Sequence, residues 1–270
     1  MQDEGKSISI SQLCKWFELP RSTFYYKNIV RKKRAIDQEL ESIIRIIIDD
    51  NPVAGLRMIT AIIRNKYGIK ANRKKIHRII RLNNWQVIRK PKGHRPRVKG
   101  WVSRTSTPDT RWAIDTTHLF CGNDGWCHLT ALIDCCDRSI IGWRFSRSGI
   151  AKVASAALED ALRYRNIKPG MGLILRSDNG LVFGSRAFVD VAKKYRLHQE
   201  YITPYTPEQN GMIERFFRTL KEECIWLNNF KGSDEAFNTI SKWIDKYNNE
   251  RPHSALNYMS PLEYRRLRAA

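Results

Sequence analysis

Residues 111–145 read RWAIDTTHLFCGNDGWCHLTALIDCCDRSIIGWRF. This stretch contains three runs rich in apolar, aromatic and β-branched residues, at 111–119, 126–133 and 140–145. Polar segments separate the runs, and Asp137-Arg138-Ser139 supplies a tight turn before the third. The pattern predicts three consecutive strands.

The following residues alternate between helical and strand patterns. We predict a helix over about 152–165, a short apolar strand at 173–175, a helix over about 185–195 and a strand near 198–202. Strands first and alternating elements later predict an α/β fold, in which helices flank a mixed five-stranded sheet.

Three acidic residues occupy positions where such a sheet gathers functional groups. Asp115 and Asp178 lie at or near the ends of predicted strands, and ligands of open α/β sheets collect at the carboxyl ends of strands. Glu214 opens a predicted helix after a proline-containing loop, and 214 − 178 − 1 = 35 residues separate it from Asp178. Three acids gathered on a basic protein suggest that divalent metal ions are held against a nucleic-acid phosphate.

The helix that begins near Gly211 has two distinct faces. Its predicted buried stripe consists of Ile213, Phe216, Phe217 and Leu220. Glu214, Arg218 and Lys221 follow at i, i+4 and i+7 on another face. A carboxylate beside two cations suits a metal ligand next to a phosphate backbone, so we predict that Arg218 and Lys221 contact DNA.

Each acid also has a structural interpretation. Glu214 can be a first-turn residue that is favoured by the helix dipole or by a capping box. Asp178 can belong to a simple Asp-Asn-Gly turn, and Asp115 can form a local hydrogen bond at the end of its strand. Asp134 and Asp137 are interpreted as turn and packing residues. The spacing alone leaves the two interpretations of the three acids open.

The charge of the chain predicts an anionic polymer as its partner. The formal net charge is 48 − 27 = +21, with an isoelectric point near 10.0. The excess is uneven, because residues 1–110 carry 25 − 9 = +16 and residues 111–270 carry 23 − 18 = +5. We therefore expect the N-terminal part to supply most of the electrostatic attraction to this polymer, and the C-terminal part to resemble an enzyme.

Neither a signal peptide nor an apolar run of membrane-spanning length is visible, so we expect a cytoplasmic protein with no membrane partner. The cysteines form no C-x-x-C pair, and the histidines do not pair with them at finger-like spacing. We therefore interpret the cysteines as reduced, mostly buried thiols. They are Cys14, Cys121, Cys127, Cys135, Cys136 and Cys224.

Residues 8–27 predict two short helices about a turn, in the outline of a helix-turn-helix fragment. An apolar stripe on the first helix consists of Ile10, Leu13 and Phe17. The residues of the second helix that we expect to contact DNA are Arg21, Ser22, Thr23 and Tyr25. A plain helical hairpin accounts for the same pattern.

Three further helices are predicted over about 36–49, 56–66 and 72–84, with a basic hinge at 31–34 before them. Asn72 is suited to cap the third helix. The outer face of that helix is basic, as expected of a helix in a major groove, and a merely solvated face is the alternative. The predicted DNA contacts are Lys74, His77, Arg78 and Arg81.

At this point the motifs resemble a known family. Residues 111–265 are similar to the catalytic part of bacterial insertion-sequence transposases, of the type encoded by a second reading frame, within the retroviral-integrase superfamily. The 35-residue gap before Glu214 is characteristic of that family. The matching motifs are Trp112-x-x-Asp115-x-Thr117, Ser177-Asp178-Asn179-Gly180, residues 204–217 (PYTPEQNGMIERFF) and Tyr247-Asn248-x-x-Arg251-Pro252-His253-x-x-Leu256-x-x-x-Ser260-Pro261.

The resemblance implies an RNase H-like core and a catalytic, metal-binding triad of Asp115, Asp178 and Glu214. It implies Mg²⁺ as cofactor, in two ions that Mn²⁺ can replace. The implied reaction is DNA cleavage at insertion-sequence ends followed by strand transfer. The implied partners are double-stranded DNA (terminal repeats and target), further copies of this chain on DNA, and a protein from an upstream frame. We expect association with the nucleoid.

The predicted domains are a helix-turn-helix fragment at 1–30, a helix-turn-helix-like DNA-binding domain at 31–90 and a basic linker at 91–108. An integrase catalytic domain with a C-terminal helical extension follows at 109–270. The alternative functions are a catalytically inactive DNA-binding regulator derived from a transposase, and a nuclease without strand transfer. For His253, DNA contact and packing remain equal alternatives.

Overall fold

The computed structural model describes residues 8–27, 35–87, 105–203 and 207–269. The expected hinge at 31–34 lies outside the described residues, as do residues 91–104 of the expected linker and residues 204–206 of the loop motif. The chain divides into two compact units, Met1–Gln38 and Glu39–Ala270. No helix among the described residues is long and apolar enough to cross a membrane.

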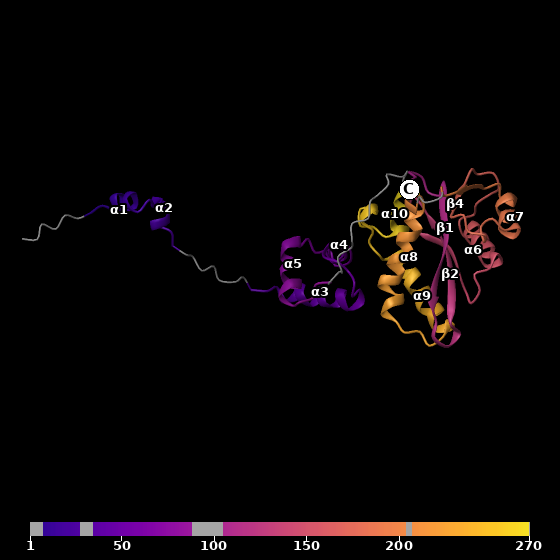
Figure 1. Cartoon of the computed structure of the whole chain (residues 1–270), viewed down its shortest axis with the longest axis horizontal. Helices are drawn as coiled ribbons and strands as arrows, with labels where there is room; N and C mark the ends of the chain where they lie inside the picture. The colour runs from indigo at the N-terminus through magenta and orange to yellow at the C-terminus, as the bar shows by residue number, and fades with distance from the viewer. Residues whose placement is uncertain (1–7, 28–34, 88–104, 204–206, 270) are drawn as a thin grey trace, which may run out of the picture. The chain divides into compact units, whose positions relative to one another are not determined.

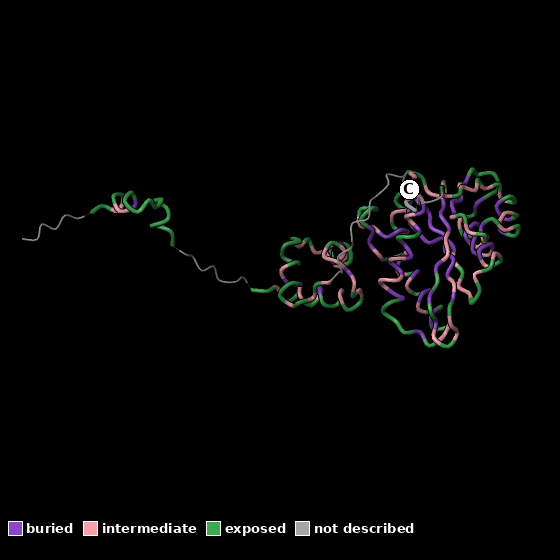
Figure 2. Tube along the Cα trace, viewed as in Figure 1, coloured by how far each residue is buried: buried purple, intermediate pink, exposed green. Residues whose placement is uncertain are grey.

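The first unit contains two short helices, α1 (Ile10–Trp16) and α2 (Arg21–Phe24). Ser9 and Gln12 form a capping box at the start of α1. The expected apolar stripe of α1 is not a core, because Cys14 is the one buried side chain among the described residues of this unit. Phe17, which belongs to that stripe, is 70% exposed, and the trace of the unit is almost wholly exposed in Figure 2.

The second unit begins with three helices, α3 (Gln38–Asp50), α4 (Leu56–Lys66) and α5 (Arg73–Leu82). The prediction of three helices is confirmed, although α3 starts two residues later than expected. Asn72 caps α5, since its side chain accepts a hydrogen bond of 2.8 Å from the amide of Lys74. Isoleucines from all three helices fill a common core: Ile44, Ile47, Ile59, Ile63, Ile76, Ile79 and Ile80.

A five-stranded mixed sheet forms the centre of the remaining residues, as predicted. The strands lie in the order β3-β2-β1-β4-β5. β2 is antiparallel to both β1 and β3, whereas β4 is parallel to both β1 and β5. The strands are β1 (Arg111–Phe120), β2 (Trp126–Asp134), β3 (Ile140–Ser146), β4 (Ile174–Ser177) and β5 (His198–Tyr201).

Helices cover both faces of the sheet (Figure 1). α6 (Ala151–Tyr164) and α7 (Arg186–Lys194) pack on one face, over a core that includes Trp112 and Leu158. α8 (Gly211–Glu223) and α9 (Ser233–Asn249) pack on the other, over a core that includes Leu129 and Phe216. This sandwich places side chains of β1 within reach of α8.

Residues of the C-terminal motif, Tyr247 to Pro261, contact both α8 and strand β3 of the sheet. Arg251 holds Glu223, the last residue of α8, through two hydrogen bonds of 2.8 and 2.6 Å. Tyr247 packs edge-on against Phe216 of α8, with ring centroids 5.2 Å apart. Asn248 donates to and accepts from the backbone of Ile140 on β3, at 2.9 Å each. α10 (Pro261–Ala269) completes the expected helical extension.

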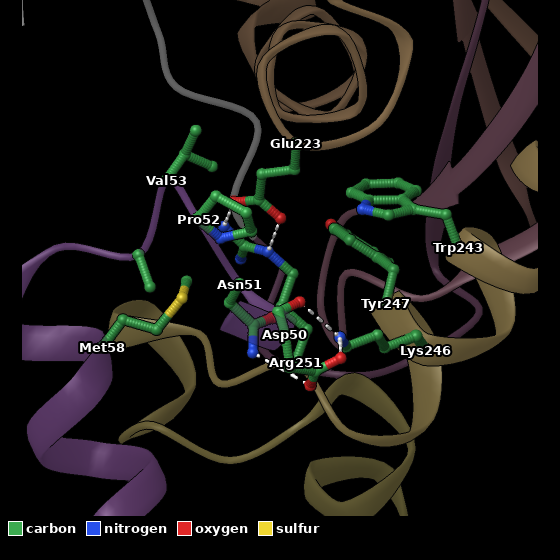
Figure 3. Close-up of a pocket in the computed structure, with 11 residues that line it drawn as sticks. Asp50, Asn51, Pro52, Val53, Met58, Glu223, Trp243, Lys246, Tyr247 and Arg251 are labelled. Atoms are coloured by element: carbon green, nitrogen blue, oxygen red, sulfur yellow. Dashed lines mark hydrogen bonds and ion pairs between the residues drawn. The ribbon is translucent and has the colours of Figure 1, made fainter. Parts of the chain in front are cut away.

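A pocket lies beside the contacts of Tyr247 and Arg251 and is drawn in Figure 3. Its walls come from the turn after α3 and from α9, and they include Pro52, Trp243 and Tyr247. Lys246 of α9 bridges to Asp50, with Nζ 2.8 Å from Oδ1 and 3.1 Å from the backbone oxygen.

Candidate active site

Asp115 lies in the middle of β1 and is half-buried. Side chains alternate along a strand, and Ala113 and Leu119 of β1 belong to the core beneath α8 and α9. Asp115 is an even number of residues from both, so its side chain lies on the same face of the sheet and points toward α8. Ala131 lies opposite Asp115 in β2, so the small neighbouring side chain leaves room around the carboxylate.

Asp178 directly follows β4, on the strand that pairs with β1. The register aligns Arg111 with Ile174, an offset of 174 − 111 = 63 residues. Continued two residues past the last paired residues, Ala113 and Arg176, the same offset would align Asp115 with Asp178, because 115 + 63 = 178. Asp178 follows the end of β4, as expected, but Asp115 lies in the middle of β1 and not at its end, because the strand continues to Phe120.

The turn after β4 holds the Asp178 side chain in place. Asp178 Oδ1 accepts a hydrogen bond of 2.9 Å from the amide of Gly180. A Cβ atom on Gly180 would lie 2.8 Å from the same oxygen. A side chain at 180 would therefore require the Asp178 carboxylate to shift.

Glu214 lies in the first turns of α8 and is exposed. The predicted stripe of Ile213, Phe216, Phe217 and Leu220 is buried against the sheet, which confirms the two faces of this helix. The capping-box interpretation of Glu214 is not supported, because Asn210 is the N-cap residue and its side chain makes no capping hydrogen bond within the described residues.

The three carboxylates lie close enough to act on one another. Burial is the main cause that raises the pKa of Asp115 from 3.8 to about 7, and the negative charges of Asp178 and Glu214 raise it further. A hydrogen bond of 2.7 Å from the Thr116 amide and the charge of Lys221 oppose the rise. The fold thus concentrates negative charge at one place, and Lys221 lies near enough to oppose it.

The chemistry of these donors suits a hard divalent cation. All three side chains offer oxygen, which Mg²⁺ prefers, and a cation would relieve the repulsion that raises the pKa of Asp115. In the described part of the chain, no group of three or more His, Cys, Asp and Glu side chains is already arranged to hold a metal ion. The carboxylates therefore fit the ion by donor type and charge, and they are not closed around an ion position.

The two predicted cations on α8 behave differently. Lys221 lies near enough to Asp115 to lower its pKa. Arg218 instead forms an ion pair of 2.7 Å with Glu222 one turn along the helix. Lys221 is therefore the cation that α8 directs toward the carboxylates.

The predicted DNA contacts of the N-terminal regions lie on short helices. On α5, Lys74, His77 and Arg81 are exposed and Arg78 is half-buried, opposite the buried isoleucine face. Arg21, Ser22 and Thr23 are on α2 and Tyr25 directly follows it, all four exposed, with the Arg21 guanidinium 5.9 Å from the Tyr25 ring centroid. These positions stay predictions.

The structure adds Arg176, which the sequence analysis did not identify. It lies on β4 and is 5% exposed. Its guanidinium binds the Glu200 carboxylate of β5 at 3.1 and 2.9 Å, and it donates to the backbone oxygen of Gln209 at 2.6 Å. An arginine that continues the wholly apolar run 173–175 was the available signal.

Two other expectations concern packing. Asp134 and Asp137 are fully buried and accept backbone hydrogen bonds in the β2–β3 turn, as predicted. His253 is 8% exposed and packs edge-on against Tyr247. Burial, with the charges of nearby arginines, holds the pKa of His253 well below its usual value, so the ring is neutral. Packing is therefore its role in this structure.

Comparison with known proteins agrees with this architecture. Residues 105–207 and 195–261 match the integrase core domain, and residues 35–93 match an HTH-like domain. The chain belongs to the integrase-core family. It is 28% identical over 250 residues to transposase InsD for insertion element IS2A/D/F/H/I/K of Escherichia coli, across 88% of this chain and 82% of that protein.

Two further similarities place this integrase-core protein among known relatives. Transposase InsD for insertion element IS2 on the F plasmid of Escherichia coli K12 matches with the same identity and coverage. The fold resembles that of a chain in the cryo-EM structure of the simian T-cell lymphotropic virus intasome in complex with PP2A regulatory subunit B56 gamma. That match has a TM-score of 0.51 and 18% identity, over 82% of this chain and 73% of the other.

Proposed function

We propose that this integrase-core protein is a transposase that cleaves DNA at the ends of an insertion sequence and joins the freed ends to target DNA. Asp115, Asp178 and Glu214 form the proposed catalytic set. The observation that carries the proposal is that β1, the end of β4 and α8 bring the three side chains close together. The charges of Asp178 and Glu214 add to the larger effect of burial in raising the pKa of Asp115. The likeness to InsD transposases supports the same reaction class.

The proposed reaction has two steps. Water first displaces the 3′ oxygen of a phosphodiester at the element end, which releases a 3′-hydroxyl. That hydroxyl then attacks a phosphorus of the target strand, so one phosphorus–oxygen bond forms as another breaks. Two Mg²⁺ ions held by the carboxylates, with Mn²⁺ as a substitute, would activate the attacking oxygen and stabilise the leaving one.

The residues of the chain have distinct parts in this proposal. The hydrogen bonds from Thr116 and Gly180 orient the carboxylates of Asp115 and Asp178. The rigid packing of α8 orients Glu214. Lys221 supplies a positive charge beside Asp115, where it would hold a phosphate of the DNA backbone.

The N-terminal regions supply DNA affinity in this proposal. α5 presents basic side chains opposite its buried face, which suits a helix that lies in a major groove. The partner is double-stranded DNA, both the terminal repeats and the target, and several copies of the chain assemble on it. The upstream-frame protein and the nucleoid association stay predictions.

The test is a cleavage and joining assay on the DNA of the element's own ends, with and without Mg²⁺. We expect Asp115→Asn, Asp178→Asn and Glu214→Gln to lose at least about 100-fold in cleavage rate while binding DNA as the wild type does. Asp190→Asn on α7 is the matched control, since Asp190 is exposed and its pairing distance to Arg186 is 3.9 Å. Cleavage at the wild-type rate by all three variants would sink the assignment.

The same assay separates the alternative functions. DNA binding without Mg²⁺-dependent cleavage by the wild-type chain would favour the inactive DNA-binding regulator. Cleavage without joining, on a substrate that carries a free 3′-hydroxyl end, would favour a nuclease.

A further inference from the structure

Arg176 lies on β4, the strand that Asp178 follows and that pairs with β1, which carries Asp115. It is two residues before Asp178, and it shares the strand register with Ala113 of β1 and Glu200 of β5. Leu175 points into the core beneath α6 and α7. Arg176 alternates with it and therefore points to the α8 face.

The contacts of Arg176 extend in two directions. Its Nε and Nη2 bind the Glu200 carboxylate as a two-pronged fork, and its Nη1 donates 2.6 Å to the backbone oxygen of Gln209. Glu200 is shared with Arg111, whose Nε lies 3.3 Å from Oε2. Burial acts to raise the pKa of Glu200, but the hydrogen bonds and charges of the two arginines hold it below its usual value.

Gln209 is the point at which the loop after β5 becomes α8. It lies two residues before Gly211, the first residue of α8, and five before Glu214. Its side chain also holds Thr203, accepting 2.9 Å from the amide and donating 3.3 Å to Oγ1. The Gln209 side chain therefore joins the start of α8 to Thr203 after β5, and Arg176 joins Gln209 to β4.

Ile202, which follows β5, is also hydrogen-bonded to the turn that carries Asp178. Asn179 donates 2.9 Å to the backbone oxygen of Ile202, and the Ile202 amide donates 3.1 Å to the backbone oxygen of Ser177. Through Ile202, Thr203 and Gln209, these hydrogen bonds link the turn that carries Asp178 to the start of α8, which carries Glu214.

We propose that Arg176 is a positioning residue, which sets the place of Glu214 relative to Asp178 by bonding β4 and β5 to the peptide that begins α8. This inference rests on the proposed function of the carboxylates. A lysine at 176 would keep the charge, but its single ammonium cannot reproduce a planar fork toward Glu200 together with a separate bond to Gln209.

The test uses Arg176→Met/Glu200→Met, which removes both charges of the fork together. Arg111, whose side chain is 23% exposed, also loses its carboxylate partner in this variant. Arg111→Met is the matched control, because Arg111 shares Glu200 but makes no hydrogen bond to Gln209 among those of the described residues. Mn²⁺ affinity is measured on the full chain by electron paramagnetic resonance. Hydrogen exchange is measured at the amides of residues 214–217, which report the first turn of α8.

We expect the double variant to bind Mn²⁺ at least about tenfold more weakly and to exchange these amides faster, while the Arg111→Met variant keeps wild-type values. Unchanged affinity and exchange in a folded double variant would overturn the proposal. Should the double variant not fold, the same measurements are made on Arg176→Lys, for which we expect a smaller loss of Mn²⁺ affinity and a smaller rise in exchange. Wild-type values in that variant would also overturn the proposal.

Failure of the proposed function has a different signature. If the wild-type chain binds no Mn²⁺, or if Glu214→Gln binds it as tightly as the wild type, the metal assignment fails. The exchange measurement still decides whether Arg176 fixes the start of α8, because that readout needs no metal.

Discussion

Single residues decide where the carboxylates lie. Ala131 places a small side chain opposite Asp115, and the amide of Gly180 donates a hydrogen bond to the Asp178 carboxylate. Neither residue carries chemistry of its own. Their small size allows charged neighbours to occupy the half-buried positions at which burial and mutual repulsion raise the pKa of Asp115.

We predict that Gly180→Ala lowers DNA cleavage at least about tenfold with little change in stability. Its added Cβ would lie 2.8 Å from Asp178 Oδ1, so the carboxylate must move, and misplacement of a reacting group by about 1 Å costs on the order of 100-fold. Cleavage rate and thermal unfolding are measured together. Gly184→Ala in the same loop is the control, since the nearest atom to its Cβ lies 4.0 Å away. Equal rates for the two variants would contradict the prediction.

At the scale of elements, the structure distinguishes helices that pack from helices that present side chains. α8 buries one face against the sheet and is held at its last residue by Arg251. α5 buries isoleucines and leaves its basic residues to solvent. α1 and α2 bury almost nothing, because four- and seven-residue helices cannot by themselves enclose a core.

We predict that Lys74→Ala/Arg81→Ala weakens DNA binding and makes it less sensitive to salt. Each lost phosphate contact should reduce the slope of log K against log salt concentration by about 1, since fewer counterions are released. Fluorescence anisotropy titrations across a range of KCl concentrations measure the slope. Arg64→Ala on α4 is the control, because Arg64 is exposed on a neighbouring helix. A slope unchanged from the wild type would reject α5 as a DNA-binding helix.

Across the whole molecule, thiols behave as parts of the core. Cys121, Cys127, Cys135, Cys136 and Cys224 are all buried in the second unit. Burial raises the pKa of Cys121 and Cys135 to about 12 and that of Cys136 and Cys224 to about 11. Because a thiol reacts as its thiolate, the raised pKa adds to the protection that burial provides.

We predict that a native chain with Cys14→Ser reacts slowly or not at all with a disulfide reagent at pH 8, and that five thiols react after denaturation in guanidinium. The reagent's absorbance measures both. The reaction rate of the native chain should rise as higher pH increases the thiolate fraction of the four cysteines with a raised pKa, or when the fold opens. Fast reaction of several thiols in the native chain at pH 8 would contradict the burial of these side chains.

Local patterns were sufficient for the strands and for most of the helices. Alternation along β1 and the 3.6-residue period of α3 to α5 arise from near neighbours in the chain, so the sequence displays them directly. The stripe of α8 was readable for the same reason. The apolar stripe of the first unit forms no core among the described residues, because an apolar stripe shows what a helix could bury and not whether a partner is present.

The sequence by itself determined which three carboxylates to consider, through their motifs and the 35-residue gap before Glu214. Only the tertiary structure decided that β1 and β4 are neighbours, that Lys221 rather than Arg218 lies beside Asp115, and that Arg176 joins β4 to the start of α8. The physical reason is that burial, ion pairing and pKa depend on residues far apart in the chain, and local periodicity carries no information about which of those residues meet.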